Sequence, residues 1–146
     1  MKQDLVVSQS VNVNAPAEKV WKALTEPALI AEYLFGTETI TDWKVGSGIV
    51  FQGVYGDNKE FSYHDKGVVL ENILYQKLSY SYWSGFSGLE DKPENYSTVT
   101  YTVNKIDDSH TTFTWTQRGF ANEEGYQRSL QGMPAFLEQI KGIMER

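Results

Sequence analysis

The sequence predicts an α+β protein built on one antiparallel β-sheet of about six to seven strands. Between about residue 37 and residue 118, apolar and aromatic residues recur at every second position, which is typical of strands. Two prolines, Pro16 and Pro27, stand where short helices can begin, and residues 122–144 carry apolar side chains at steps of three and four. Strands and helices are segregated along the chain, which favours α+β over an alternating α/β fold.

The first part of the chain predicts a strand at Leu5–Val13 followed by two short helices in NAPAEKVWKALTEPALIAEY, Asn14–Tyr33. Pro16 is expected as the first helical residue, where its missing N–H costs nothing. Thr25 is expected to cap the second helix, with Pro27 in its first turn. Each helix has one apolar side, formed by Val20, Trp21 and Leu24 in the first and by Leu29, Ile30 and Tyr33 in the second.

The middle of the chain predicts a series of strands separated by turns. Turn signals stand at GDNK, residues 56–59, and at DDSH, residues 107–110, and Gly85–Asn95 reads as a polar loop. Serine and threonine alternate with aromatic residues, so one face of the sheet is expected to meet solvent. The expected strands cover residues 49–55, 60–71, 78–83, 97–103 and 111–117.

The last segment predicts one long helix that covers the apolar face of the sheet. Asn122 can cap it, and Pro134 in its middle removes a hydrogen bond and predicts a kink. The two short helices are expected to close the end of the sheet and to cradle the long helix. The apolar stripe consists of Tyr126, Leu130, Met133, Leu137, Ile140 and Met144, widened by Phe136 and Ile143.

Length, charge and composition narrow the class of protein. The 146 residues fit a single domain, residues 1–146, and the net charge of −6 argues against nucleic acid and anionic membranes as partners. There is no cysteine, no secretory pattern near the start and no apolar run approaching the roughly 18 residues of a membrane span. The sequence therefore predicts a cytoplasmic protein.

Catalytic and metal-binding patterns are scarce. The two histidines, His64 and His110, do not stand at ligand spacing, so neither a metal site nor a cofactor is expected. There is no nucleophile elbow, and no catalytic residue is predicted. His64 and Asp65 are adjacent on a strand and should point to opposite faces. Asp65 either faces a pocket or lies in solvent at the strand's end.

The aromatic residues form the candidate ligand-binding site. They lie opposite the polar face of the sheet and can either fill the core or line a pocket. Trp83 breaks the alternation of its strand and is expected at the pocket mouth with Phe86. The predicted ligand-binding residues are Phe51, Tyr63, Tyr80, Tyr82, Trp83, Tyr101, Phe113, Trp115, Met133, Phe136 and Leu137.

Four segments in order resemble one known superfamily: NAPAEKVWKALTEPALIAEY, DWKVGSGIVFQG, GVVLENILYQKLSYSYW and GMPAFLEQIKGIME. They are similar to the SRPBCC, or START-like, superfamily, and within it to proteins like the C-terminal domain of activators of the ninety-kilodalton heat-shock chaperone's ATPase. The resemblance implies a helix-grip fold, in which a curved sheet wraps around the C-terminal helix and often leaves a cavity. The family often has tryptophan where Met133 stands, so a pocket here is expected to be wider or more adaptable.

Three functions are compatible with these observations. The first is a binding protein that encloses an apolar or aromatic small molecule between the sheet and the C-terminal helix. The second is a chaperone partner with an exposed apolar patch at Tyr33-Leu34-Phe35 or on the Gly85–Asn95 loop. The third, ranked last because no acid–base set is evident, is a cyclase or aromatase. The ligand's identity stays open, as does the choice between a monomer and a homodimer.

Overall fold

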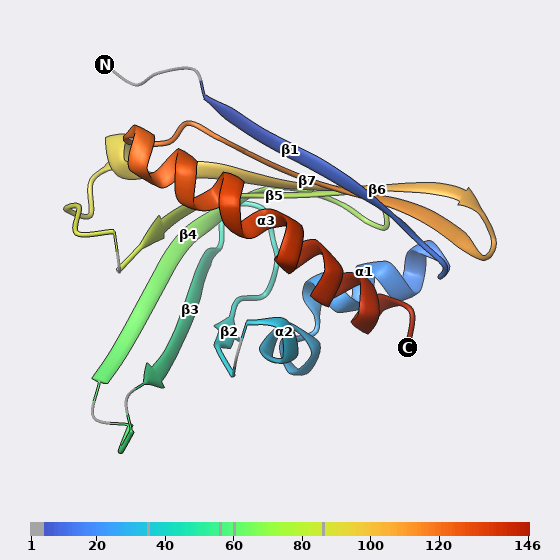
Figure 1. Cartoon of the computed structure of the whole chain (residues 1–146), viewed down its shortest axis with the longest axis horizontal. Coiled ribbons are helices and arrows are strands. Elements are labelled where there is room, and N and C mark those ends of the chain that lie inside the picture. The colour runs from blue at the N-terminus through green and yellow to red at the C-terminus, as the bar shows by residue number, and fades with distance from the viewer. Residues whose placement is uncertain (1–4, 35, 56, 60, 86) are drawn as a thin grey trace.

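A computed structural model describes residues 5–34, 36–55, 57–59, 61–85 and 87–146 of the chain. Within them, seven antiparallel strands form one curved sheet, and the long helix α3 (Glu123–Met144) crosses its inner face (Figure 1). Two short helices, α1 (Ala17–Thr25) and α2 (Pro27–Tyr33), follow the first strand. The predicted α+β class and order of elements are confirmed.

The sheet has the spatial order β1-β7-β6-β5-β4-β3-β2. Each strand from β2 to β7 pairs with its neighbour in sequence, and β1 joins the sheet beside β7. The sequence did not predict β2, because three residues are too few to display a two-residue period. The strands are β1 Val6–Val13, β2 Glu38–Ile40, β3 Gly48–Tyr55, β4 Phe61–Ile73, β5 Lys77–Ser84, β6 Ser97–Asp107 and β7 His110–Arg118.

The two faces of the sheet differ as the alternation predicts. Hydroxyl pairs join strands on the outer face, with Ser8 Oγ 3.0 Å from Thr116 Oγ1 and Ser10 Oγ 2.7 Å from Thr114 Oγ1. The inner face is apolar and packs against α3, because a sheet with one apolar face must cover it. Its buried apolar members are Val7, Val13, Ile49, Phe51, Val69, Leu78, Tyr80, Val99, Tyr101, Val103 and Phe113.

The start of each short helix differs slightly from the prediction. Pro16 is the N-cap residue of α1 and not its first helical residue. Glu26, and not Thr25, precedes α2 as its N-cap, and the Thr25 hydroxyl instead donates to the Trp21 carbonyl at 2.9 Å. The residue before a proline is driven out of the α region, and Glu26 therefore takes the extended conformation that separates the helices.

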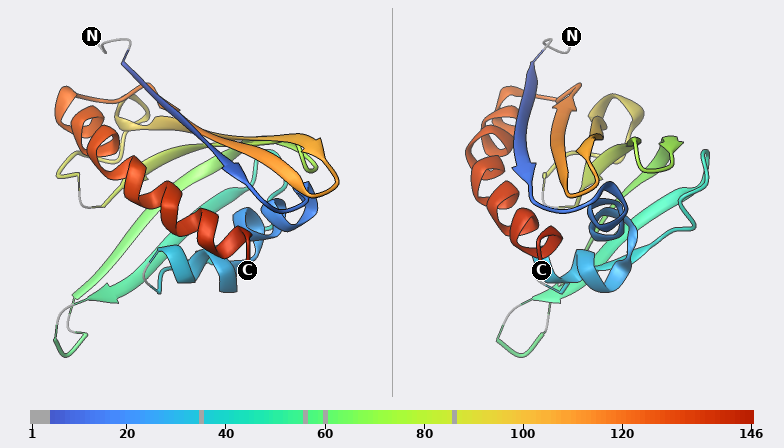
Figure 2. Two further views of the ribbon diagram at one scale, coloured as in Figure 1. Left: turned by 45° about the vertical axis from the view of Figure 1, so that its right-hand side comes forward. Right: turned by 90° about the vertical axis from the view of Figure 1, so that its right-hand side faces the viewer.

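The short helices close the sheet beneath the C-terminal end of α3 (Figure 2). The Tyr33 hydroxyl of α2 donates to the Ala23 carbonyl of α1 at 2.8 Å, and its ring meets the edge of Phe136 on α3 at 5.4 Å. The Arg146 guanidinium donates twice to the Glu32 carboxylate, at 2.7 Å each. The break between α1 and α2 thus allows both short helices to contact α3.

Helix α3 is continuous through Pro134, which lies on its exposed side. The Asn122 side chain accepts a hydrogen bond from the Gly125 N–H at 2.9 Å, and this confirms the predicted cap. Leu130, placed in the apolar stripe by its spacing, is exposed. The buried residues of the helix are Met133, Leu137, Ile140 and Met144. None of the helices in the described ranges combines the length and the apolarity that crossing a membrane requires.

Candidate functional site: an aromatic cavity under the long helix

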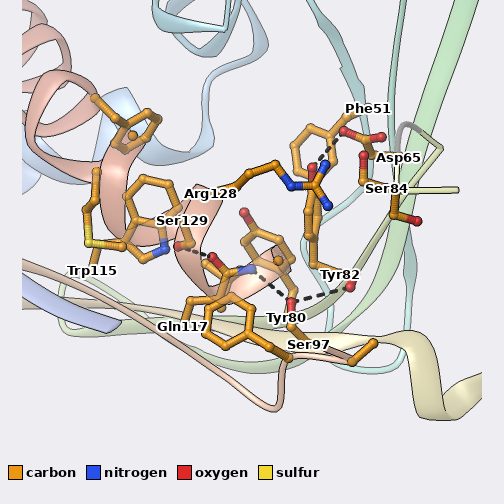
Figure 3. Close-up of a pocket in the computed structure, with 18 of the residues that line it drawn as sticks. Phe51, Asp65, Tyr80, Tyr82, Ser84, Ser97, Trp115, Gln117, Arg128 and Ser129 are labelled. Carbon is orange, nitrogen blue, oxygen red and sulfur yellow. Dashed lines mark hydrogen bonds between the residues drawn. The ribbon is translucent and has the colours of Figure 1, made fainter. Parts of the chain in front are cut away.

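A cavity of about 470 Å³ lies between the inner face of the sheet and the N-terminal half of α3 (Figure 3). Its wall comes mainly from strands β3 to β7, from the segments that follow β5 and β7, and from α3. The cavity is partly open to solvent, and its volume lies in the range of small-molecule sites. The same curvature that wraps the sheet around α3 therefore leaves room beneath the helix.

A continuous row of aromatic rings lines this cavity. Phe51 of β3 lies 5.8 Å from Tyr80 of β5, which lies 5.8 Å from Tyr101 of β6. Tyr101 meets Trp115 of β7 at 6.2 Å, and Trp115 meets Phe136 of α3 at 4.1 Å. These tilted and edge-on contacts hold the rings in a rigid wall that runs from the sheet to the helix.

Two phenols supply a polar point within this wall. The hydroxyl oxygens of Tyr80 and Tyr101 lie 2.9 Å apart, and both side chains are buried. Burial raises the pKa of Tyr101 to about 12, and burial together with the neighbouring Tyr101 raises the pKa of Tyr80 well above its usual value. Both phenols are therefore neutral near pH 7 and act as hydrogen-bonding groups.

A polar relay ties the sheet to the helix on another side of the cavity. The buried Gln117 of β7 donates from Nε2 to Ser97 Oγ of β6 at 2.9 Å. Its Oε1 accepts a bond from Ser129 Oγ of α3 at 2.7 Å (Figure 3). Because each of these bonds joins a different pair of elements, the relay fixes the position of α3 relative to the two strands.

Two charged residues lie at the cavity wall, Asp65 of β4 and Arg128 of α3. Asp65 accepts bonds from the Tyr82 hydroxyl at 2.7 Å and from the Gly85 N–H at 2.9 Å. Burial, followed by the Asp65 charge, raises the pKa of Tyr82 well above its usual value. The Arg128 side chain points along the cavity towards the side that carries Tyr82 and Asp65 (Figure 3).

Seven of the eleven predicted ligand-binding residues line the cavity, and the other four lie outside its wall. Ligand binding by these residues stays a prediction. The seven are Phe51, Tyr80, Tyr82, Tyr101, Trp115, Met133 and Phe136. The four are Tyr63, Trp83, Phe113 and Leu137.

The side chains of two of these four contact other groups. Tyr63 lies over Gly53, and its hydroxyl bonds to the Thr37 hydroxyl. Trp83 follows the alternation of β5 and points away from the cavity that Tyr82 lines. It packs against His64 at 5.8 Å and donates to the Leu89 carbonyl at 3.2 Å. Phe86, its predicted companion at the mouth, lies outside the described residues.

The other two belong to the solid core. Phe113 has no exposed surface and packs behind Tyr101, with ring centres 5.6 Å apart. Leu137 lies one residue beyond Phe136 on α3 and is buried. A two-residue or 3.6-residue period identifies a face but not the depth of each position along it, so these two residues could not be separated from the wall by sequence.

Several wall residues escaped prediction although a signal for them existed. Gln117 shares its strand face with Phe113 and Trp115, and the same alternation would have placed it inward. Ser129 and Gly132 precede Phe136 at helical spacing on the same side of α3. The predicted site consists of aromatic and apolar side chains, and these polar and small residues are therefore not among them. Arg128 stands four residues before Gly132 on the same side of α3, so the same spacing would have placed it at the wall.

The structure separates His64 from Asp65, as their adjacency on one strand predicts. His64 is exposed beside Trp83, whereas Asp65 lines the cavity, so the two do not face one substrate. Arg118 and Glu71 are exposed near their strand ends. Among the described residues, no group of three or more His, Cys, Asp or Glu is placed to hold a metal ion.

A curved antiparallel sheet that grips a long C-terminal helix over a cavity defines the START-like, helix-grip class of proteins. Residues 14–145 match the family described as Activator of Hsp90 ATPase homolog 1-like protein. The chain belongs to this family.

Solved structures agree with this assignment. The chain is similar to ChR145 from Cytophaga hutchinsonii, with 37% identity, a TM-score of 0.79, and coverage of 97% of this chain and 94% of the other. It shares its fold with MLL2253 from Mesorhizobium loti, at 24% identity, a TM-score of 0.73, and 95% and 96% coverage. It also shares its fold with PFC0360w, an HSP90 activator from Plasmodium falciparum, at 18% identity, a TM-score of 0.70, and 96% coverage of each chain. A comparison with curated proteins found no match.

Proposed function

We propose that this protein binds an apolar or aromatic small molecule in the cavity between the sheet and α3. One observation carries the proposal: a row of aromatic rings lines a cavity of about 470 Å³ that is partly open to solvent and that the protein's own side chains leave unfilled. Protein interiors are normally packed as densely as organic crystals, and unfilled apolar space forfeits contacts. A ligand in this cavity would restore those contacts.

The first test is native mass spectrometry of the freshly purified protein, compared with its denatured mass. We expect an additional small mass that is lost on denaturation. Since a co-purified ligand can be lost during purification, binding of 1-anilinonaphthalene-8-sulfonate, an aromatic reporter of apolar cavities, is measured on the same sample by its fluorescence.

Two glycines of α3 offer a matched pair of variants. A Cβ at Gly132, which lines the cavity, or at Gly142, farther along the helix, would meet no atom within 4 Å. We expect Gly132→Phe to reduce binding of the ligand and of the reporter, because the ring would be added at a position that lines the cavity. Gly142→Phe should leave both unchanged. Equal binding by both variants, or no binding by the wild type, would contradict the proposal.

A second candidate function is interaction with a chaperone of the ninety-kilodalton heat-shock class. It is favoured by the family's description and by three consecutive exposed apolar side chains, Ile73, Leu74 and Tyr75, at the β4–β5 hairpin. This patch differs from the two expected ones. At the first, Tyr33 is buried, Leu34 lines the cavity, and Phe35 lies outside the described residues. At the second, the Gly85–Asn95 loop, Leu89 is half-buried and lines the cavity, and Phe86 lies outside the described residues.

Chaperone ATPase activity tests this second candidate. If the exposed hairpin binds the chaperone, the protein should stimulate ATP hydrolysis and Leu74→Ser should reduce the stimulation. Val45→Ser, at another exposed apolar residue, is the matched control and should have no effect. Absence of stimulation by the wild type would rule against the candidate.

A further inference from the structure

We infer that the ligand of this cavity is an apolar molecule carrying one carboxylate, and that Arg128 binds this carboxylate. The inference rests on the proposed ligand-binding function and specifies the chemical class of the ligand. Some hydrogen-bonding groups in the wall already have a partner and others do not, and the inference follows from this difference.

Arg128 has no charged partner among the described residues. Among the described residues that line the cavity it is the one cationic side chain, and it forms neither an ion pair nor a hydrogen bond with the parts of the chain that the structure describes. Arg146 shows the contrasting case at the surface, where both of its terminal nitrogens donate to Glu32. A guanidinium presents a planar set of donors that matches a carboxylate in two parallel bonds.

The carboxylate of Asp65 does not take the place of a ligand. Each of its oxygens already accepts a bond, one from the Tyr82 hydroxyl and one from the Gly85 N–H. Both bonds hold the Asp65 carboxylate on the β4–β5 side of the cavity. Arg128 of α3 points towards that side but forms no ion pair with Asp65, so its donors have no acceptor among the described residues and are available to a ligand (Figure 3).

Two further donors of the wall have no acceptor among the described residues. The indole Nε1 of Trp115 is buried and has no hydrogen-bond partner among the described residues. The single bond between Tyr80 and Tyr101 uses one of two hydroxyl hydrogens, and no described group accepts the other. Buried donors without acceptors are rare and call for a water or a ligand.

Two acceptors on another side of the cavity are in contrast already used. Gln117 Oε1 accepts from Ser129, and Ser97 Oγ accepts from Gln117. A ligand that offers acceptor oxygens would thus meet free donors, whereas a ligand rich in donors would compete with existing bonds. An apolar carboxylic acid matches both parts of the site: its carboxylate would bind Arg128 near solvent, and its apolar body would lie against the aromatic rings.

The test compares acids with their neutral amides of nearly equal size. Naphthalene-2-acetic acid and naphthalene-2-acetamide form the aromatic pair, and decanoic acid and decanamide form the aliphatic pair. Affinity is measured by isothermal titration calorimetry with the wild type, with Arg128→Gln, and with Arg118→Gln. Arg118 is exposed on β7 and does not line the cavity, so its variant makes the same change in net charge elsewhere.

We expect at least one acid to bind the wild type about tenfold or more tightly than its amide, the gain of a charge-assisted hydrogen bond. Arg128→Gln should remove this preference without weakening the amide, and Arg118→Gln should retain it. Equal affinities of acid and amide for the wild type would overturn the carboxylate inference and leave ligand binding intact. An acid preference that survives in Arg128→Gln would overturn the role of Arg128. Failure of all four compounds to bind would overturn the proposed function together with the inference.

Discussion

The hydroxyl oxygens of Tyr80 and Tyr101 lie 2.9 Å apart, at diagonal positions on the adjacent strands β5 and β6. Tyr80 stands opposite Val99, and Tyr101 stands opposite Leu78. Each tyrosine therefore lies two residues away from the position directly across from the other, which is within reach of aromatic side chains. This contact places two polar atoms in an otherwise aromatic wall. It also links the stability of the sheet to the ionisation of its phenols.

The protein should lose stability in alkaline solution because of this pair. Burial raises the pKa of Tyr101 to about 12, above its usual value of about 10, so the folded state holds the phenolic proton more tightly than the unfolded state. The contribution of the Tyr101 phenol to the free energy of unfolding is complete below about pH 10 and is lost as the pH rises through about 12. Urea denaturation across this range should show the free energy of unfolding falling. Tyr101→Phe should show a smaller fall, and an equal fall would contradict the assignment.

Tyr82→Phe should affect ligand binding more than folding. The change removes the bond to Asp65, which still accepts from the Gly85 N–H, so the free energy of unfolding should fall by only about 1 kcal/mol. The less satisfied carboxylate then faces the cavity and should alter the affinity for naphthalene-2-acetic acid by a larger free energy. Tyr96→Phe, which loses a bond to Asp91 outside the cavity, is the control. Equal losses in binding and folding would assign the Tyr82 hydroxyl a structural role.

Trp21→Ala should be among the most damaging substitutions in α1. Trp21 is only 6% exposed and meets the ring of Tyr75 edge-on at 6.2 Å, so truncation should cost about 3–5 kcal/mol. Lys22→Ala, at the exposed neighbouring position, should change the free energy of unfolding by no more than about 0.5 kcal/mol. Urea denaturation measures both. A loss below about 1 kcal/mol for Trp21→Ala would show that this side chain does not anchor the helix.

Gly67→Ala should prevent or severely weaken folding. A Cβ at this position of β4 would overlap the Ser81 carbonyl oxygen on β5, a backbone atom that cannot move aside alone, so a loss above about 3 kcal/mol is expected. Gly48→Ala in β3 is the matched control, since the added Cβ would lie 3.9 Å from the Gly67 carbonyl oxygen. Circular dichroism and urea denaturation distinguish the two variants. Similar stability for both would mean that β4 and β5 can separate at this point.

Local signals in the sequence identified most elements but not their ends. Pro27 predicted the second helix correctly, but the N-cap of that helix is Glu26. A proline restricts the backbone of the residue directly before it, and that residue is Glu26. The spacing of Leu130 placed it in the apolar stripe, although α3 turns that position to solvent. The three-residue strand β2 depends on pairing with β3 and carries no signal of its own.

The sequence by itself determined the order of elements, the inward face of each strand and the aromatic character of the site. These follow from periodicities of two and 3.6 residues, which are local properties of strand and helix. Only the tertiary structure decided that Phe113 fills the core while Trp115 lines a cavity, and that Arg128 meets the same space as Asp65. The depth of a side chain and the distance between elements depend on how a curved sheet packs against a helix, and that packing is set by the whole chain together.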